Sequence, residues 1–178
     1  KGGAIKNGWR DEESDILIYM DIDLAVALED TDKLIKAVIE ENYDMAIGSR
    51  MLAESIIDRP WLRELASQVY GLLSRLILGH HFSDVQCGFK AMRRELFKKV
   101  SPHIKNNKWT FDTELVAFAK HFGFSIKEVP VDWRENIYEG RSSKIKVFKD
   151  AVGFFANLIK LKFRLLMINR QNRKIAIK

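Results

Sequence analysis

Two apolar runs of strand length, separated by one amphipathic segment, constrain the fold of this chain more than any other feature. The first run extends from Asp15 to Met20 and the second from Asp44 to Gly48. Between them, residues 30–42 place apolar side chains at helical spacing. A continuous apolar run predicts a strand that is buried on both faces, as in parallel sheets. Strand, helix and strand within about 35 residues form a βαβ unit, so the sequence predicts an α/β fold.

Further helices and strands are predicted along the rest of the chain. Pro60 and Gly79 bracket a long predicted helix over residues 61–78, because proline suits the start of a helix and glycine the position after its end. Residues 125–133 alternate as a strand. The remaining predictions are a short helical stretch that ends near Arg10, a strand over 88–92, helices over 94–100 and 112–122, and a final helix over 146–168.

The composition fits one globular domain, with room for a small appendage. The chain has 178 residues, of which 47% are hydrophobic, enough to bury a single core. Cys87 is the only cysteine, and no cleavable signal peptide opens the chain, so we expect a reducing environment on the cytosolic side of a membrane. The longest apolar runs are shorter than the roughly 18 residues that indicate a transmembrane helix.

The positive charge lies at the carboxyl terminus. Ten lysine and arginine residues and a single acid, Asp150, lie within residues 144–178, so this tail carries +9; the whole chain carries +6, and residues 1–143 therefore carry −3. This distribution argues against a nucleic-acid partner, because such a protein would carry a basic patch on its body. We expect two parts, a globular part over 1–143 and a basic amphipathic tail over 144–178.

The final helix allows two interpretations. Its apolar side chains, which include the adjacent Phe154 and Phe155, are flanked by lysines and arginines. A helix of this kind either packs its apolar stripe on the domain or lies in a membrane interface, with lysines among anionic headgroups. The apolar arc is wider than a soluble surface helix needs, which favours an anionic membrane surface as the partner.

Two Asp-x-Asp triplets have different expected roles. Asp30 and Asp32 begin a predicted helix, where carboxylates cap backbone N–H groups. Asp21 and Asp23 instead end an apolar strand, at the carboxyl edge where open α/β sheets bind ligands. Two carboxylates there either are solvated loop acids or hold Mg²⁺ or Mn²⁺, since these hard cations prefer oxygen ligands.

The most specific pattern is the segment Asp84-Val-Gln-Cys-Gly-Phe-Lys-Ala-Met92, followed by Trp109-Thr-Phe-Asp-Thr-Glu-Leu115. Together with several shorter segments elsewhere in the chain, it resembles the family-2 glycosyltransferases with a GT-A fold. The resemblance is strongest to the polyprenyl (dolichyl) phosphate hexose synthases, and among them to the dolichyl-phosphate glucose synthase branch. It implies a Rossmann-like mixed sheet flanked by helices. The other segments are Lys1-Gly-Gly-Ala4, Tyr19-Met-Asp-Ile-Asp-Leu24, Gly48-Ser-Arg50, Leu62-Arg63 with Ser67, Glu128-Val-Pro-Val-Asp-Trp133 and Gly140-Arg-Ser-Ser-Lys144.

The resemblance implies metal-dependent, inverting transfer of a hexose from a nucleotide sugar to a lipid phosphate at the cytosolic membrane face. The donor would be UDP-glucose or GDP-mannose, and the acceptor polyprenyl or dolichyl phosphate. Asp21 and Asp23 would hold the metal. Donor binding would further involve Gly2, Gly3, Ser49 and Gln86, catalysis Asp112, Glu114 and Arg50, and binding of the acceptor phosphate Arg63, Ser67, Arg141 and Lys144.

Several alternatives stay open at this level. Asp112 and Glu114 begin a predicted helix and could simply cap it, and Arg50 could pair with Asp58 or Glu54. Another acceptor, such as diacylglycerol or a polysaccharide, or a non-catalytic docking domain, would also fit. Family members carry a nucleotide-binding strand and an Asp-rich turn upstream of the Lys-Gly-Gly segment, so residues 1–143 are expected to be the carboxyl-proximal part of a GT-A domain.

Overall fold

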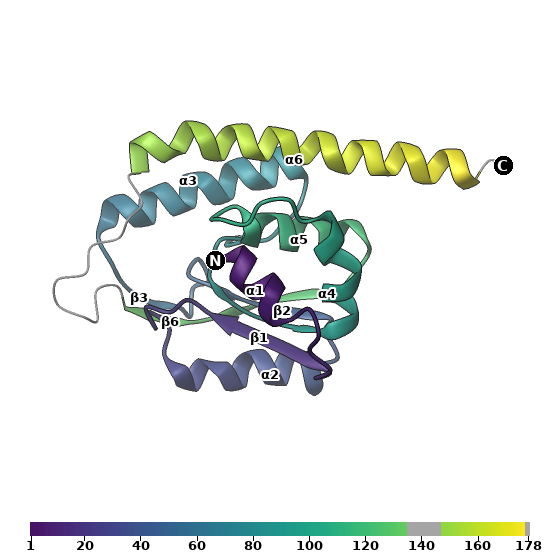
Figure 1. The fold of residues 1–178 in the computed structure, drawn as a ribbon. Coiled ribbons are helices and arrows are strands. Elements are labelled where there is room, and N and C mark those ends of the chain that lie inside the picture. The colour runs from purple at the N-terminus through teal and green to yellow at the C-terminus, as the bar shows by residue number, and fades with distance from the viewer. Residues whose placement is uncertain (135–146, 177–178) are drawn as a thin grey trace.

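The computed structural model describes residues 1–134 and 147–176, with side chains from 153 to 169 in the second range. A four-stranded sheet of order β1-β4-β2-β5 forms its centre (Figure 1). Strand β4 is antiparallel to both neighbours, and β2 is parallel to β5. The predicted mixed α/β fold is therefore confirmed, with β4 between the two strands of the expected βαβ unit. The strands are β1 (Ile16–Met20), β2 (Met45–Ser49), β4 (Phe89–Arg93) and β5 (Ile126–Pro130).

The single strand predicted over 125–133 is wrong, because the chain changes sheets there. Strand β5 pairs with β2 as far as Pro130, opposite Ser49. Strand β6 (Asp132–Arg134) then pairs with the short β3 (Ile56–Asp58) in a second, two-stranded sheet. Strand β3 has three residues and two of them are exposed, so it lacks the apolar run that would have predicted it.

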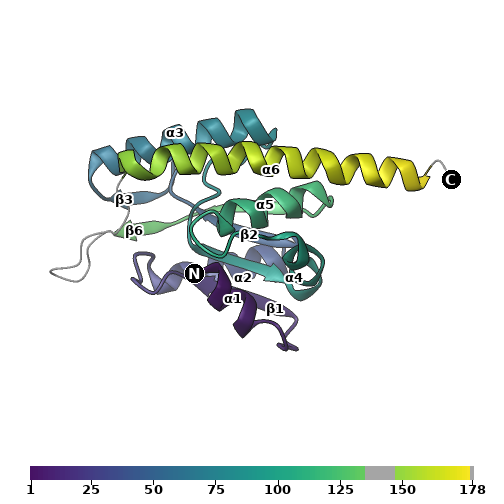
Figure 2. The same ribbon diagram turned by 45° about the horizontal axis from the view of Figure 1, so that its top comes forward.

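Helices cover both faces of the central sheet (Figures 1 and 2). Helix α2 lies on one face, and α4 and α5 lie on the other. Helices α3 and α6 run side by side outside α5, which makes a further layer. The helices are α1 (Gly2–Gly8), α2 (Thr31–Ile39), α3 (Trp61–Leu78), α4 (Arg94–Val100), α5 (Phe111–His121) and α6 (Val147–Ala176), with 3₁₀ turns η1 (Leu28–Asp30) and η2 (Ser101–His103).

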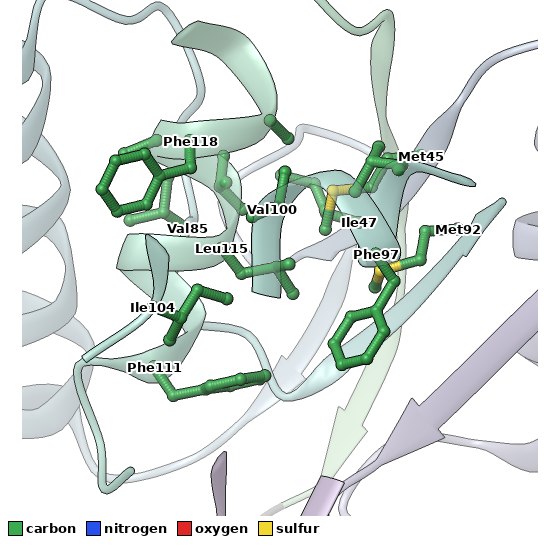
Figure 3. Close-up of a cluster of buried hydrophobic side chains, with 14 of the residues drawn as sticks. Met45, Ile47, Val85, Met92, Phe97, Val100, Ile104, Phe111, Leu115 and Phe118 are labelled. Carbon is green, nitrogen blue, oxygen red and sulfur yellow. The ribbon is translucent and has the colours of Figure 1, made fainter. Parts of the chain in front are cut away.

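The alternation of side chains along the strands divides the core into two clusters. In β2, Met45 and Ile47 point to the α5 side, where they meet Leu115 and other side chains of α4 and α5 (Figure 3). Ala46 points the other way and packs with Leu34 of α2. The sheet is thus buried on both faces, as the apolar runs predict.

Helix α6 is both a core element and an exposed one. Leu158, Leu161 and Leu165 are buried against the domain, which confirms the packing interpretation for one stripe. Other apolar side chains stay exposed, among them Phe163 at 63% and Met167 at 65%. In the described part of the chain, no helix is long and apolar enough to cross a membrane.

The predicted capping role of Asp30 is wrong. Asp30 precedes α2, but its side chain makes no capping hydrogen bond. Its carboxylate instead accepts a hydrogen bond from the Asp132 amide at 2.6 Å and pairs with Lys33, also at 2.6 Å. It ties the start of α2 to the second sheet, a contact between residues 102 positions apart that the local sequence could not indicate.

Candidate active site

The carboxyl ends of β1 and β2 and the amino end of β4 meet at one edge of the central sheet. Because β4 is antiparallel to its neighbours, Met20 lies opposite Phe89 at this edge. Asp21 and Asp23 follow β1 directly, in a turn closed by the Leu24 amide, which donates to the Asp21 carbonyl oxygen at 3.1 Å. Open α/β sheets bind ligands at this edge, so both aspartates lie where a ligand is expected.

Asp112 lies near Asp21, and one lysine bridges the two carboxylates. Lys1 Nζ is 2.8 Å from Asp21 Oδ1 and 2.8 Å from Asp112 Oδ2. Lys90 Nζ contacts Asp112 Oδ1 at 2.9 Å, and the Tyr19 hydroxyl donates to the same oxygen at 2.5 Å. The Asp112 carboxylate is thus enclosed by two ammonium groups and a phenol, and it does not cap α5.

Burial and charge together set the ionisation of this cluster. Burial by itself would raise the pKa of Asp112, but Lys90 and Lys1 outweigh it and hold that pKa below its usual value. Burial also raises the pKa of Asp21, and Lys1 offsets the rise only in part. Burial, followed by the Asp112 charge, raises the pKa of Tyr19 well above its usual value. The Tyr19 hydroxyl therefore stays protonated and acts as a donor to an ionised Asp112.

The Asp21 carboxylate is in a position that fits a hard divalent cation. The Lys1 ammonium already lies between Asp21 and Asp112, so this edge is built to hold positive charge. A Cβ at position 88 would lie 2.0 Å from Asp21 Oδ2, so Gly88 is what lets that carboxylate lie there. Within residues 1–134 and 147–176, no three His, Cys, Asp or Glu side chains are grouped to hold a metal. Asp21 and Asp23 would need diphosphate or water oxygens to complete a metal's shell.

Arg50 is buried and paired with Asp84 rather than with Asp58 or Glu54. Its Nε and Nη2 donate to the two Asp84 oxygens at 2.6 and 2.9 Å, and its guanidinium lies over the Trp133 ring, 4.6 Å from the centroid. Burial by itself would lower the pKa of Arg50, but Asp84 raises it above its usual value. The Arg50 side chain is therefore a positive charge held in one position just after the carboxyl end of β2.

Glu128 holds the loop that carries Asp84. Its carboxylate accepts hydrogen bonds from the Ser83 amide at 3.0 Å, the Ser83 hydroxyl at 2.6 Å and the Asp84 amide at 3.1 Å. Ser83 also hydrogen-bonds the Ser49 hydroxyl at 2.8 Å. A polar network therefore connects β5, this loop and the end of β2.

The other residues expected to bind the donor make contacts mainly with α5 and the loop before it. Gln86 donates from Nε2 to the Thr113 hydroxyl at 2.8 Å, which connects the loop before β4 with α5. A Cβ on Gly2 would meet the Phe111 ring at 2.5 Å, so this glycine allows close packing of α1 on α5. The Gly3 amide donates to the Asn107 carbonyl oxygen at 3.3 Å.

Glu114 has partners quite different from those of Asp112. Its carboxylate accepts hydrogen bonds from the Lys105 amide at 2.7 Å and from Arg164 of α6 at 2.6 Å. These contacts position the loop before α5 and fasten α6 to the domain. Within the described residues, Glu114 therefore makes no hydrogen bond or ion pair to the Asp21 and Asp112 cluster, and it does not cap α5.

The residues expected at the acceptor phosphate are only partly placed. Arg63 and Ser67 both lie on α3, and the Ser67 hydroxyl accepts a hydrogen bond from Arg59 at 3.3 Å. Arg141 and Lys144 lie outside the described residues.

Sequence reasoning missed Lys1, Lys90 and Tyr19 as members of the site. Lys90 is 0% exposed and lies between the apolar Phe89 and Ala91 in β4, which is the available signal: a lysine is rarely fully buried without an ionic partner. Tyr19 occupies a position in β1 at which the sequence predicts a core side chain. Lys1 belongs to a glycine-rich segment, and no local pattern connects it with Asp112.

A profile of the family described as Glycosyl transferase family 2 matches residues 1–101. Glycosyltransferase AglD of Haloferax volcanii is 33% identical over 177 residues, which cover 99% of this chain and 28% of that protein. Dolichyl-phosphate beta-glucosyltransferase of Saccharomyces cerevisiae is 28% identical over 188 residues, covering 98% of this chain and 55% of that protein. Polyprenol monophosphomannose synthase of Mycolicibacterium smegmatis is 34% identical over 122 residues, covering 67% of this chain and 46% of that protein. The chain thus spans 28% to 55% of the length of these relatives.

The fold also has a counterpart among solved structures. The crystal structure of glucosyl-3-phosphoglycerate synthase from Mycobacterium tuberculosis, in complex with uridine-diphosphate, matches with a TM-score of 0.59 and 17% sequence identity. The match covers 93% of this chain and 55% of that one. Together with the family profile, it confirms the predicted GT-A fold. Because the profile matches more than half of the residues, the chain belongs to glycosyl transferase family 2.

Proposed function

We propose that this glycosyltransferase moves a hexose from a nucleotide sugar to a polyprenyl or dolichyl phosphate. The convergence of Asp21 and Asp112 around Lys1 at the carboxyl edge of the sheet is the observation that carries the proposal. Relatives named for dolichyl-phosphate glucosyl transfer and for polyprenol monophosphomannose synthesis support the choice of acceptor. The donor would be UDP-glucose or GDP-mannose.

Asp21 and Asp23 would hold Mg²⁺ or Mn²⁺ together with the donor diphosphate. When bound, such a cation neutralises the charge that develops on the leaving diphosphate. Lys1 lies against the same carboxylate, so its ammonium is placed to contact a diphosphate oxygen as well. Ser49, Gln86, Gly2 and Gly3 would contribute to donor binding in this proposal.

Asp112 orients the sugar in this proposal. A phosphate-monoester acceptor is already anionic at neutral pH, so its attack on the anomeric carbon needs positioning more than a strong base. An ionised Asp112 held by Lys90 and Tyr19 presents a fixed acceptor for sugar hydroxyl groups. Attack from the face opposite the diphosphate would invert the anomeric centre.

Arg50 supplies a fixed positive charge at the same edge. Asp84 engages its Nε and Nη2, and Nη1 makes no hydrogen bond within the part of the chain that the structure describes. One face of the guanidinium fork is therefore left for a phosphate oxygen. We assign Glu114 a positioning role, because its contacts fasten α6 and the loop before α5.

The acceptor would be reached from an anionic membrane surface on the cytosolic side. Helices α3 and α6 lie side by side (Figure 2), and both carry large exposed apolar side chains. Arg63 and Ser67 on α3, with Arg141 and Lys144, would bind the acceptor phosphate. The exposed apolar side chains of α3 are Trp61, Leu62, Leu65, Val69, Leu72 and Leu76, and those of α6 are Phe155, Phe163, Leu166 and Met167.

The test is a transfer assay with the full-length enzyme, labelled UDP-glucose or GDP-mannose, and dolichyl phosphate in vesicles, with and without divalent cation. Asp21→Asn and Asp112→Asn should each lower transfer at least about a hundredfold, as expected for charged groups at the reacting centre. Asp15→Asn, at the other end of β1 and 95% exposed, is the matched control and should retain activity. Transfer to diacylglycerol instead of the lipid phosphate would overturn the assigned acceptor.

A further inference from the structure

A second polar site lies at the end of α5 opposite Asp112. A pocket of about 180 Å³ is formed where the end of α3, the last turns of α5 and the middle of α6 meet. Four basic or imidazole side chains line it, and apolar side chains of α3 and α6 complete its walls. The basic and imidazole side chains are His80, Lys120, His121 and Lys162, and the polar Asn169 also lines the pocket.

The lining of this pocket is basic. No carboxylate belongs to its lining, and neither Lys120 nor Lys162 has an ion pair within the described part of the chain. Burial, and then the Lys120 charge, lower the pKa of His80 to about 4, so this imidazole is neutral at pH 7. Two ammonium groups, of the exposed Lys120 and the half-buried Lys162, thus line one pocket with no carboxylate among its described residues, and a cleft lined by one sign of charge attracts an anion.

The size of the pocket limits the anion. Its volume is about 180 Å³. This is room for a phosphate group but is well below the roughly 300–1,000 Å³ of pockets for drug-sized ligands. The site therefore suits a single phosphate rather than a sugar nucleotide.

An apolar strip begins at the rim of the pocket. Leu166 lines the pocket and is itself 46% exposed. Phe163 and Met167, on the adjoining face of α6, are more exposed still. A phospholipid would fit both features. Its phosphate headgroup would lie between Lys120 and Lys162, and its acyl chain would lie along this apolar strip.

We propose that this pocket binds the phosphate headgroup of an anionic membrane lipid. The site is distinct from the expected acceptor site, because Arg63 and Leu78 lie 15 residues apart on α3, about 22 Å along the helix axis. It therefore gives the enzyme a second contact with the membrane, through a lipid that is not consumed. This role is independent of transfer and does not require the proposed function.

The experiment measures binding of the full-length enzyme to phosphatidylcholine vesicles with and without phosphatidic acid. Lys120→Gln with Lys162→Gln should weaken binding to phosphatidic acid vesicles about thirtyfold, from roughly 1 kcal/mol for each lysine at the headgroups. The matched control is Lys36→Gln with Lys98→Gln, which removes the same charge from α2 and α4 and should change binding by no more than about twofold. Replacing the two pocket lysines with arginine should retain binding.

Three outcomes would overturn the proposal. If the pocket variant and the control lose vesicle binding equally, the binding depends on the net charge of the protein and not on the pocket. The wild type could bind inorganic phosphate in a calorimeter, lose this binding in the pocket variant and show no preference for phosphatidic acid vesicles. That result would assign the site to a free anion instead of a lipid headgroup. If the double variant fails to unfold cooperatively in urea, Lys162→Gln alone is used, and unchanged vesicle binding by that variant would also contradict the proposal.

Discussion

At the scale of single residues, the candidate site depends on buried charges that neutralise one another. Asp112 is ionised because Lys90 and Lys1 flank it, and Arg50 is fixed because Asp84 engages two of its nitrogens. Buried ion pairs do not always add stability, but removal of one partner leaves an uncompensated charge. The residues that hold Asp112 and Arg50 should therefore affect both stability and activity.

Lys90→Met should destabilise the protein by about 3–5 kcal/mol, because it leaves the buried Asp112 carboxylate without its closest fully buried cation. The free energy of unfolding in urea measures the effect. Adding Asp112→Asn to Lys90→Met should recover much of the loss, since the pair is then uncharged. If the double variant is as unstable as the sum of the two single variants, Lys90 contributes through packing and not through Asp112.

Asp84 and Asp112 should make the protein acid-sensitive. Both have pKa values held below the usual one, by Arg50 and by Lys90 with Lys1 respectively, against the opposing effect of burial. A lowered folded-state pKa gives stability that is present above the unfolded-state pKa of about 3.9 and is lost as the pH falls through the folded value. Urea unfolding at a series of pH values from about 5 downward should show this loss. Asp84→Asn should make the free energy of unfolding depend less steeply on pH. An unchanged pH dependence would show that Asp84 is not a source of the acid sensitivity.

Gly88→Ala should displace Asp21, because the added Cβ would lie 2.0 Å from its carboxylate oxygen. We expect loss of divalent-metal-dependent binding of the nucleotide sugar by the full-length enzyme, with circular dichroism unchanged. Gly8→Ala is the matched control, since a Cβ there meets nothing within 4 Å. Equal binding by the two variants would show that the position of Asp21 does not matter for the donor.

At the scale of elements, α6 combines a buried stripe with an exposed apolar arc. Leu158, Leu161 and Leu165 complete the core on the α5 side, and Arg164 pairs with Glu114. The other arc continues along the outside with Phe163 and Met167. The packing interpretation of this helix is therefore confirmed for one face, and the membrane interpretation stays a prediction for the other face.

Leu161→Ala should destabilise the domain by about 2–5 kcal/mol, the usual cost of truncating a fully buried leucine. Phe163→Ala, two residues on and 63% exposed, should leave the free energy of unfolding within about 0.5 kcal/mol but weaken vesicle binding. The two measurements separate the core face from the membrane face. Comparable destabilisation by both substitutions would mean that the outer arc is also part of the folded core.

At the scale of the whole molecule, charge and apolar surface are segregated. The tail over 144–178 carries +9, whereas residues 1–143 carry −3. Helices α3 and α6 form the same outer layer of the molecule (Figure 1), and both carry exposed apolar side chains. In the proposed function, this layer would face the anionic membrane.

Binding to anionic vesicles should weaken with salt but should not vanish. Screening acts over about 10 Å at 0.1 M ionic strength, so the contribution of the basic tail fades while the apolar contribution of α3 and α6 persists. Sedimentation with vesicles over a salt series measures both parts. Complete release at high salt would exclude apolar insertion, and indifference to salt would exclude the electrostatic part.

The local features of this protein can be predicted from its amino-acid sequence. Apolar runs predicted β1 and β2, helical spacing with Pro60 and Gly79 predicted α3, and Asp21 with Asp23 were placed at a strand end. Each of these depends on neighbouring residues, for which periodicity and turn chemistry suffice. The ordered motifs also identified the family and the GT-A fold, which the comparisons confirm.

The folded chain brings distant residues together in the candidate site. It inserted β4 between β1 and β2, split the predicted strand at Pro130, and gave Asp30 a partner in the second sheet. It also joined Asp112 to Lys1 and to Tyr19, which is 93 positions away. These contacts follow from strand order and from the packing of α5 on the sheet. No local pattern encodes them. The sequence around a carboxylate at the start of a helix is the same whether the carboxylate caps that helix or pairs with a lysine from a distant strand.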